Sequence, residues 1–221
     1  MDSRVLLYLC IGTFAMLIPM LVLGWTYRIQ WWKIAAAAVL LTVSGTLSTN
    51  IWYFIENGRF DGRSFYGAVF LVPLIFIPVA KLLRMEYGKL LDLSAPSECV
   101  MLTLMKYICL TEGCCIGKVL SVTAEGVEVR FPSQLSEAVF ALLLAVALIL
   151  LARNAKNQGK LFPWYMVIYG AGRFVLNLFR ETDEAFLFGL PAGNVWSIVS
   201  VAVGAAWLYF IARKRNTQTV A

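Results

Sequence analysis

The sequence has no histidine, and only 14% of its 221 residues are charged. Without histidine the chain lacks the commonest general base and the commonest protein metal ligand, so any proton transfer must use lysine, tyrosine, cysteine or an acidic side chain. The low charge accompanies 60% hydrophobic residues, a composition that excludes an ordinary soluble domain. We therefore expect a multi-pass membrane protein that uses no metal and no other cofactor.

The cysteines also lack the patterns that carry metal or redox chemistry. Five are present, yet no CxxC pair and no second ligand cluster accompanies Cys109, Cys114 and Cys115. A disulfide between the neighbours Cys114 and Cys115 would strain the backbone, and free cysteine is a common small apolar residue in buried sites. The sequence predicts neither a zinc site nor a redox motif.

Long apolar runs are what the sequence has in abundance. A helix that spans a membrane needs about 20 predominantly apolar residues, and the chain offers seven such segments. The first resembles a signal peptide, but its apolar run is too long and no small-residue cleavage site follows it. We predict an all-α polytopic membrane protein, a single seven-helix domain over residues 1–221 without internal repeats. The predicted spans are 5–25, 34–55, 65–83, 91–111, 136–152, 161–179 and 190–212.

The charged residues between these spans predict the orientation. Basic loops follow the first, third, fifth and seventh spans, while the alternate loops carry most of the acids, so we expect the N-terminus outside and the C-terminus in the cytoplasm. This distribution also accounts for the net charge of +6 without a nucleic-acid partner. The cations are Arg28, Lys33, Lys81, Arg84, Lys89, Arg153, Lys156, Lys160 and 213–215, and the acids are Glu56, Asp61, Glu125, Glu128, Glu181, Asp183 and Glu184.

An arginine interrupts the sixth predicted span. Helical periodicity places Tyr169, Arg173 and Asn177 on one face, with Arg180 a turn further on. A guanidinium near the bilayer centre costs about 3 kcal/mol even on a lenient insertion scale, so it needs an internal partner, a wet cavity or an anionic ligand. Snorkelling to the headgroups is the alternative, and it suits Arg180 better. We expect a functional role for Arg173.

Polar residues also gather at the outer ends of the other predicted spans. Independent snorkelling does not require this convergence, which indicates one shared site. Structural alternatives stay open: the segment before the third span is a turn, Lys106 pairs with Glu98 or snorkels, and Glu137 suits the positive end of a helix that Ser133 caps. The converging residues are Ser64, Tyr66, Lys106, Glu112, Arg130, Gln134 and Glu137.

The outer loop at 112–135 contains a sequence that superficially suggests a phosphate-binding loop. That motif needs four residues between its glycines and a serine or threonine after its lysine, whereas here three residues separate Gly113 from Gly117, and Val119 follows the lysine. A nucleotide site is therefore excluded. Residues 119–129 alternate in polarity around a Glu-Gly pair, which favours a short hairpin.

The order and spacing of these motifs resemble the bacterial prolipoprotein diacylglyceryl transferase family. The resemblance runs from about the second span to the last; its single pieces are weak, and their order makes it specific. The motifs are GRSFYGA at 62–68, DLSAP at 92–96, Met105-Lys106, EGCCIG at 112–117, FPSQLSE at 131–137, YGAGR at 169–173, FRE at 179–181 and GNVWS at 193–197.

The resemblance implies a seven-helix enzyme of the bacterial cytoplasmic (inner) membrane. Such an enzyme transfers a diacylglyceryl group from phosphatidylglycerol to the lipobox cysteine thiol of a prolipoprotein, at the outer leaflet, and releases glycerol phosphate. The implied partners are phosphatidylglycerol, the prolipoprotein signal peptide and membrane lipids, with no nucleic acid. A non-catalytic relative that binds or moves phospholipid is the alternative; a transporter would ordinarily show paired repeats or broken helices, and the sequence shows neither.

The resemblance assigns roles residue by residue. Arg173 and Tyr169 match the family, whereas Tyr66 stands where histidine is usual, Lys106 where arginine is usual, and Glu112 where asparagine is usual. Asn177 stands where a glutamate is common. The catalytic hypothesis is that Arg173 and Lys106 bind phosphate, while Tyr66, with Glu112 as runner-up, orients or deprotonates the acceptor. The predicted substrate-binding residues are Tyr169, Gln134, Glu137, Asn177, Arg180 and Ser64.

Overall fold

The computed structural model describes residues 3–181 and 185–220, and it describes side chains over 10–181 and 185–214. Asp183 and Glu184, two of the acids expected in the outer loops, lie outside the described residues, as does the side chain of Arg215.

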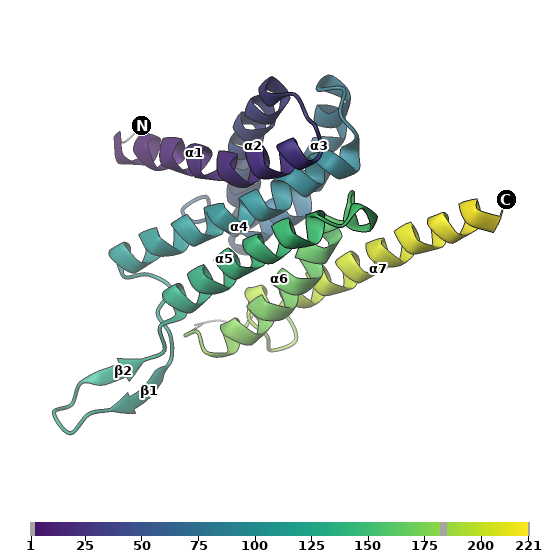
Figure 1. The fold of residues 1–221 in the computed structure, drawn as a ribbon. Coiled ribbons are helices and arrows are strands. Elements are labelled where there is room, and N and C mark those ends of the chain that lie inside the picture. The colour runs from purple at the N-terminus through teal and green to yellow at the C-terminus, as the bar shows by residue number, and fades with distance from the viewer. Residues whose placement is uncertain (1–2, 182–184, 221) are drawn as a thin grey trace.

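The described chain forms seven α-helices, a short 3-10 helix and a two-stranded hairpin (Figure 1). Each of the seven predicted spans overlaps one α-helix. The structure therefore confirms an all-α architecture for the bulk of the chain. The helices are α1 (Ser3–Thr26), α2 (Trp31–Asn57), α3 (Tyr66–Leu82), α4 (Tyr87–Glu112), α5 (Ser133–Ala152), α6 (Leu161–Leu178) and α7 (Ala192–Val220).

Among the described residues, four helices are long and apolar enough to cross a membrane: α2, α4, α5 and the part of α7 at Ala192–Lys214. Two shorter apolar stretches are Cys10–Thr26 and Tyr66–Leu82. Helix α5 shows the pattern most clearly, because small and large apolar side chains are buried on one face while large ones are exposed on the other. Such an exposed apolar stripe suits contact with lipid. The chain is a multi-pass membrane protein.

Helix α4 lies in the middle of the bundle, beside α5 and across α1 (Figure 1). Its first half is buried almost without interruption, and it carries Asp92 at the end opposite the hairpin. The Asp92 carboxylate accepts hydrogen bonds from the Tyr27 hydroxyl at 2.9 Å and from the backbone N–H groups of Gly159 at 2.5 Å and Leu161 at 2.8 Å. One side chain thus connects the end of α1 and the start of α6 to α4.

Two glycines let α3 approach α2 and let α6 approach α7 closely. A Cβ atom on Gly67 would lie 2.0 Å from the carbonyl oxygen of Ser48, so α3 can pack on α2 at this point only without a side chain. A Cβ atom on Gly170 would lie 2.8 Å from the carbonyl oxygen of Ser197, which brings α6 against α7 in the same way. These contacts set the positions of the neighbouring residues Tyr66 and Tyr169.

Strands β1 (Val119–Val122) and β2 (Glu128–Arg130) pair antiparallel in the loop between α4 and α5 and project from the bundle (Figure 1). Arg130 pairs with Glu128 on the same hairpin and with Glu181 after α6. The Lys118 N–H donates to the Phe179 carbonyl at 2.9 Å. The base of the hairpin is therefore attached to the segment that follows α6.

The start of α5 differs from the capped helix considered as an alternative. Pro132 occupies the N-cap position and no side chain caps the helix. The hydroxyl of Ser133 instead donates to the carbonyl of Cys115 at 2.5 Å, and the amide of Gln134 donates to the carbonyl of Cys114 at 2.6 Å. These residues hold the preceding loop in place, because the two carbonyls come from the turn that follows α4.

Candidate active site

A cavity of about 510 Å³ opens at the end of the bundle where α4 finishes and α5 begins. Residues of α2, α3, α4, α5, α6 and the start of α7 line it, together with the segments that follow α2, α4 and α6. Four cations and three carboxylates face this space, an unusual concentration of charge for a bundle of apolar helices. The charged lining residues are Glu56, Arg63, Lys106, Glu137, Arg173, Arg180 and Glu181.

Glu137 forms the centre of this charge cluster. One of its carboxylate oxygens lies 2.6 Å from Lys106 Nζ, and the other contacts Arg173 Nη1. The carboxylate is 2% exposed and Lys106 is 7% exposed, so the three charges compensate one another away from water. Arg173 therefore has an internal partner, and Lys106 pairs across to α5 rather than with Glu98 on its own helix. We call these three residues the charge triad.

The triad carries one net positive charge, because a single carboxylate lies between two cations. Arg180, which lines the same cavity, adds a further cation, and no described residue accepts a hydrogen bond from its buried Nε. A phosphate group supplies the acceptor oxygens that such donors lack. The electrostatics of the cavity therefore favour an anionic ligand.

Tyr66 is the first residue of α3 and also lines the cavity. Its hydroxyl lies 2.6 Å from Ser197 Oγ, while the Ser197 hydroxyl donates to the Gly193 carbonyl at 2.6 Å. Because Ser197 has one proton to give, Tyr66 must be the donor in the first of these bonds. The ring of Tyr66 packs beside Tyr169, with centroids 5.7 Å apart. The phenol is thus held in one orientation at the cavity wall.

Three further predicted residues line the cavity through fixed contacts. Ser64 donates to Glu56 Oε1 at 2.9 Å, and Asn177 donates to the side chain of Asn194 on α7. Arg180 Nη2 lies 3.1 Å from Cys115 Sγ. The hydrogen bond with Cys109 and the positive charges of Lys106 and Arg180 lower the pKa of the Cys115 thiol below its ordinary value.

Glu112 and Gln134 are not brought into the cavity lining. Glu112 is the last residue of α4 and is exposed, and Gln134 is engaged with the loop carbonyl of Cys114. Both were predicted near the site because the sequence places them at the outer ends of α4 and α5. The direction of a side chain around a helix end depends on packing, which the linear pattern does not contain.

The structure adds residues that the predicted site did not include. Glu56 lines the cavity from the end of α2, and Cys109 and Cys115 line it from α4 and the turn after it. Ser197 and Asn194 support Tyr66 and Asn177 from α7. Asn194 and Ser197 belong to the GNVWS motif, so the resemblance already pointed to them. For Glu56 the sequence contained no sign of a site role beyond its place among the acids of an outer loop.

The family model described as prolipoprotein diacylglyceryl transferase matches residues 49–210. This range contains the charge triad and every other charged residue of the cavity lining. The chain belongs to this family. The match confirms the resemblance drawn from the motifs, and it runs from the second half of α2 to the body of α7.

Curated relatives of the family extend the likeness over most of the chain. A phosphatidylglycerol–prolipoprotein diacylglyceryl transferase of Dehalococcoides mccartyi is 23% identical over 206 residues, covering 83% of this chain and 78% of the relative. A second enzyme of that name from Clostridium perfringens is 25% identical over 203 residues, with 81% and 78% covered. One from Campylobacter curvus is 31% identical over 181 residues, with 72% and 62% covered.

Proposed function

We propose that this chain transfers the diacylglyceryl group of phosphatidylglycerol to the lipobox cysteine thiol of a prolipoprotein. The reaction is that of the family to which the chain belongs. The observation that supports this reaction in this chain is the charge triad, which lies on the wall of a cavity inside an apolar bundle. The reaction takes place at the outer leaflet of the bacterial cytoplasmic membrane, with the N-terminus outside and the C-terminus in the cytoplasm. The basic loops support that orientation.

Arg173 and Lys106 bind the phosphate of the lipid. In the structure both contact Glu137, and an entering phosphodiester offers them a second anion. Arg173 presents a planar fork that matches two phosphate oxygens, while Lys106 acts as a point charge. Arg180 reaches the same cavity, and its Nε has no acceptor among the described residues. The phosphate therefore binds among three cations.

The chemical step is a substitution at the glyceryl carbon that carries the phosphate. The thiolate sulfur forms a bond to that carbon while the carbon–oxygen bond to phosphate breaks, and glycerol phosphate leaves with the bonding electrons. The leaving group gains negative charge as the reaction proceeds. Cations already in position stabilise this developing charge more than they stabilise the substrate, which is what accelerates the step.

The thiol proton goes to a carboxylate of the cavity, and Tyr66 orients the acceptor. Tyr66 donates its own proton to Ser197, so its remaining lone pairs accept a hydrogen bond from an incoming thiol. Glu112, the runner-up for this role in the sequence, lies outside the lining. Glu137 is better placed, because the phosphate takes over its cations and leaves the carboxylate free to accept the proton.

The test uses membranes that contain only this enzyme, phosphatidylglycerol labelled in its acyl chains, and a lipobox peptide. The expected product is the peptide with label on its cysteine, and a peptide with serine at that position is the control. Lys106→Arg restores the fork that the family usually has and is expected to keep or raise the rate. Label on a different acceptor would keep the chemistry and reject the proposed substrate.

A second candidate function is supported by the engagement of Glu137 with both Lys106 and Arg173. If Glu137 keeps these two cations with lipid bound, it is not free to accept the thiol proton, and the protein binds or moves phospholipid without transferring its glyceryl group. This alternative predicts phosphatidylglycerol bound to the purified protein at one molecule per chain and no thioether product. The labelled-lipid experiment separates the two functions, because only transfer moves label to the peptide.

A further inference from the structure

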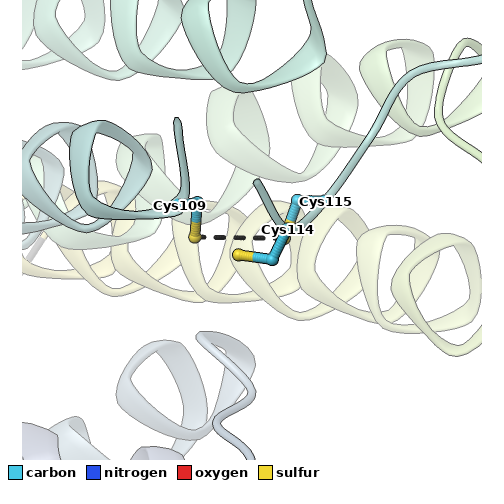
Figure 2. A group of neighbouring side chains, drawn as sticks. All are labelled: Cys109, Cys114 and Cys115. Atoms are coloured by element: carbon cyan, nitrogen blue, oxygen red, sulfur yellow. Dashed lines mark hydrogen bonds between the residues drawn. The ribbon is translucent and has the colours of Figure 1, made fainter. Parts of the chain in front are cut away.

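Three cysteine side chains meet at the end of α4 (Figure 2), and two of them, Cys109 and Cys115, line the cavity. Cys109 lies on the last turns of α4, and Cys114 and Cys115 lie in the turn that follows. The three sulfur atoms all lie within 4.8 Å of one another, and Cys109 Sγ is 4.0 Å from Cys115 Sγ. All three are free thiols. We call this group the cysteine cluster.

The backbone around the cysteine cluster holds the sulfurs together. Gly113 ends α4 with a φ of 68°, and Cys115 takes a φ of 61°, a left-handed conformation that is uncommon for a residue with a side chain. The carbonyls of Cys114 and Cys115 are bound by Gln134 and Ser133 at the start of α5. The turn is thus fixed from both helices, so the cluster exists before any ligand arrives.

The spacing of the sulfurs matches that of three thiolates around one metal ion. A soft metal binds cysteine sulfur at about 2.3 Å, and three sulfurs arranged in a plane around it lie about 4 Å apart. Thiolates select soft ions such as copper(I) and zinc. Zinc sites normally have four ligands, and the group found here consists of three cysteines in a chain without histidine. Three sulfur ligands therefore favour copper(I).

We propose that Cys109, Cys114 and Cys115 form a binding site for a single copper(I) ion. Cys114 is exposed and gives the ion a path from solvent, while Cys109 and Cys115 face the cavity. Binding of the ion releases the three thiol protons to solvent, so three thiolates and one copper(I) carry two net negative charges. Arg180, 3.1 Å from Cys115 Sγ, and Lys106 on the same cavity supply positive charge to balance them.

Copper bound at this place inhibits the transferase, a consequence that rests on the proposed function. Arg180 in contact with a copper–thiolate centre is no longer available to a phosphate, and the ion itself occupies the cavity edge. Lys106 also loses part of its attraction for phosphate, because a second negative centre lies near it. The expected result is a weaker affinity for phosphatidylglycerol when copper is present.

The first experiment measures copper binding directly. The full chain, purified in detergent micelles and kept reduced with ascorbate under argon, is titrated with copper(I) in competition with a chromophoric copper(I) chelator. One ion per chain is expected, and Cys109→Ser, Cys114→Ser and Cys115→Ser are each expected to weaken binding by about 100-fold or more, beyond the loss caused by an outer-shell change. Cys10→Ser, an exposed cysteine on α1, is the matched control and leaves binding unchanged.

A second measurement on the unmodified chain does not depend on how the variants fold. Copper should protect Cys109, Cys114 and Cys115, but not Cys10, from alkylation, as read by peptide mass spectrometry. Equal protection of Cys10, or wild-type affinity no tighter than that of the triple serine variant, would overturn the site. Tighter binding of zinc than of copper(I) would overturn the assigned metal, and a Cys109–Cys115 disulfide that forms in place of copper binding would overturn the metal site itself.

Transfer activity measured with and without copper distinguishes a wrong copper site from a wrong proposed function. Copper should inhibit transfer by the unmodified enzyme but not by Cys114→Ser, whose side chain does not line the cavity. If copper binds and transfer is unaffected, the inhibitory role is rejected while the binding site stands. If the chain shows no transfer at all, the proposed function is rejected, and the titration still decides whether copper binds.

Discussion

Two buried carboxylates, Asp92 near the start of α4 and Glu137 on α5, have opposite kinds of partner. Asp92 accepts three hydrogen bonds from the protein itself, from Tyr27, Gly159 and Leu161. Glu137, facing Lys106 near the other end of α4, is held by two cations that also line a cavity. The hydrogen bonds that Asp92 accepts connect α4 to the end of α1 and the start of α6. Glu137 is part of an arrangement with surplus positive charge and space for a ligand.

Asp92 and Glu137 differ in their partners rather than in their burial. Both carboxylates are 2% exposed or less, so burial does not distinguish them. What distinguishes them is the identity of the partners: neutral donors satisfy Asp92, whereas Glu137 is satisfied by charges that an anionic substrate can take over. Substitutions of residues around Asp92 and around Glu137 should therefore have different effects.

Arg173→Ala should lower the rate of diacylglyceryl transfer by about 1,000-fold, because it removes the bidentate cation that stabilises the leaving phosphate. The labelled-lipid assay measures this rate. Arg153→Ala, which removes an exposed arginine just after α5, is the matched control and should transfer normally. Full activity in Arg173→Ala would remove the central residue of the proposed site.

Asp92→Ala should lower the free energy of unfolding by about 3 kcal/mol, because it leaves buried donors of Tyr27, Gly159 and Leu161 without an acceptor. The folded fraction that remains as denaturing detergent is added reports this loss. The part that stays folded should bind phosphatidylglycerol with unchanged affinity. Asp61→Ala, at an exposed loop position, provides the comparison for a carboxylate without buried partners. Unchanged stability would show that the hydrogen bonds of Asp92 contribute little.

Tyr66→Phe should lower kcat by about tenfold and leave the binding of phosphatidylglycerol unchanged, because it removes the hydroxyl that orients the thiol but none of the cations. Single-turnover transfer and lipid binding measured on the same preparation separate the two quantities. Tyr107→Phe changes an exposed tyrosine of α4 and serves as the control. A loss of lipid binding with unchanged kcat would assign Tyr66 to the lipid rather than to the acceptor.

Glu112→Gln should change transfer by less than about twofold, since the side chain is exposed at the end of α4 and does not line the cavity. The same labelled-lipid assay suffices. A large loss would mean that Glu112 acts after a rearrangement of the turn after α4, and it would return this residue to the role considered for it from the sequence. Of the substitutions considered, Glu112→Gln should therefore have the smallest effect on transfer.

Much of the fold was accessible from sequence because the signal is local. A run of apolar residues long enough to cross a bilayer predicts a helix without knowledge of its neighbours, and the periodicity of α6 correctly places Tyr169, Arg173 and Asn177 toward the cavity. The sequence also predicted that Lys106 shares a site with Arg173, but it did not identify the partner of Lys106. Glu98, two turns away on the same helix, was one alternative, because the sequence shows neighbours along a helix but not across to another one.

The cysteine cluster illustrates the same limit. Its residues lack the spacing of known metal motifs, so the sequence predicted no site. The sulfurs meet because Gly113 and Cys115 adopt left-handed conformations and because α5 holds the turn. A helix end and an adjacent turn can place ligands together at spacings that no short motif describes.

The amino-acid sequence by itself determined that this protein is a bundle of apolar helices with a cationic polar face at one end, and its motifs determined the family. Only the tertiary structure decided that Glu137 joins Arg173 to Lys106, that Tyr66 is held by Ser197, and that Glu112 stays outside the cavity. The physical reason is that helix formation depends on residues a few positions apart. Pairing across helices depends instead on their rotation and spacing, which close contacts such as those at Gly67 and Gly170 establish only when the whole bundle packs.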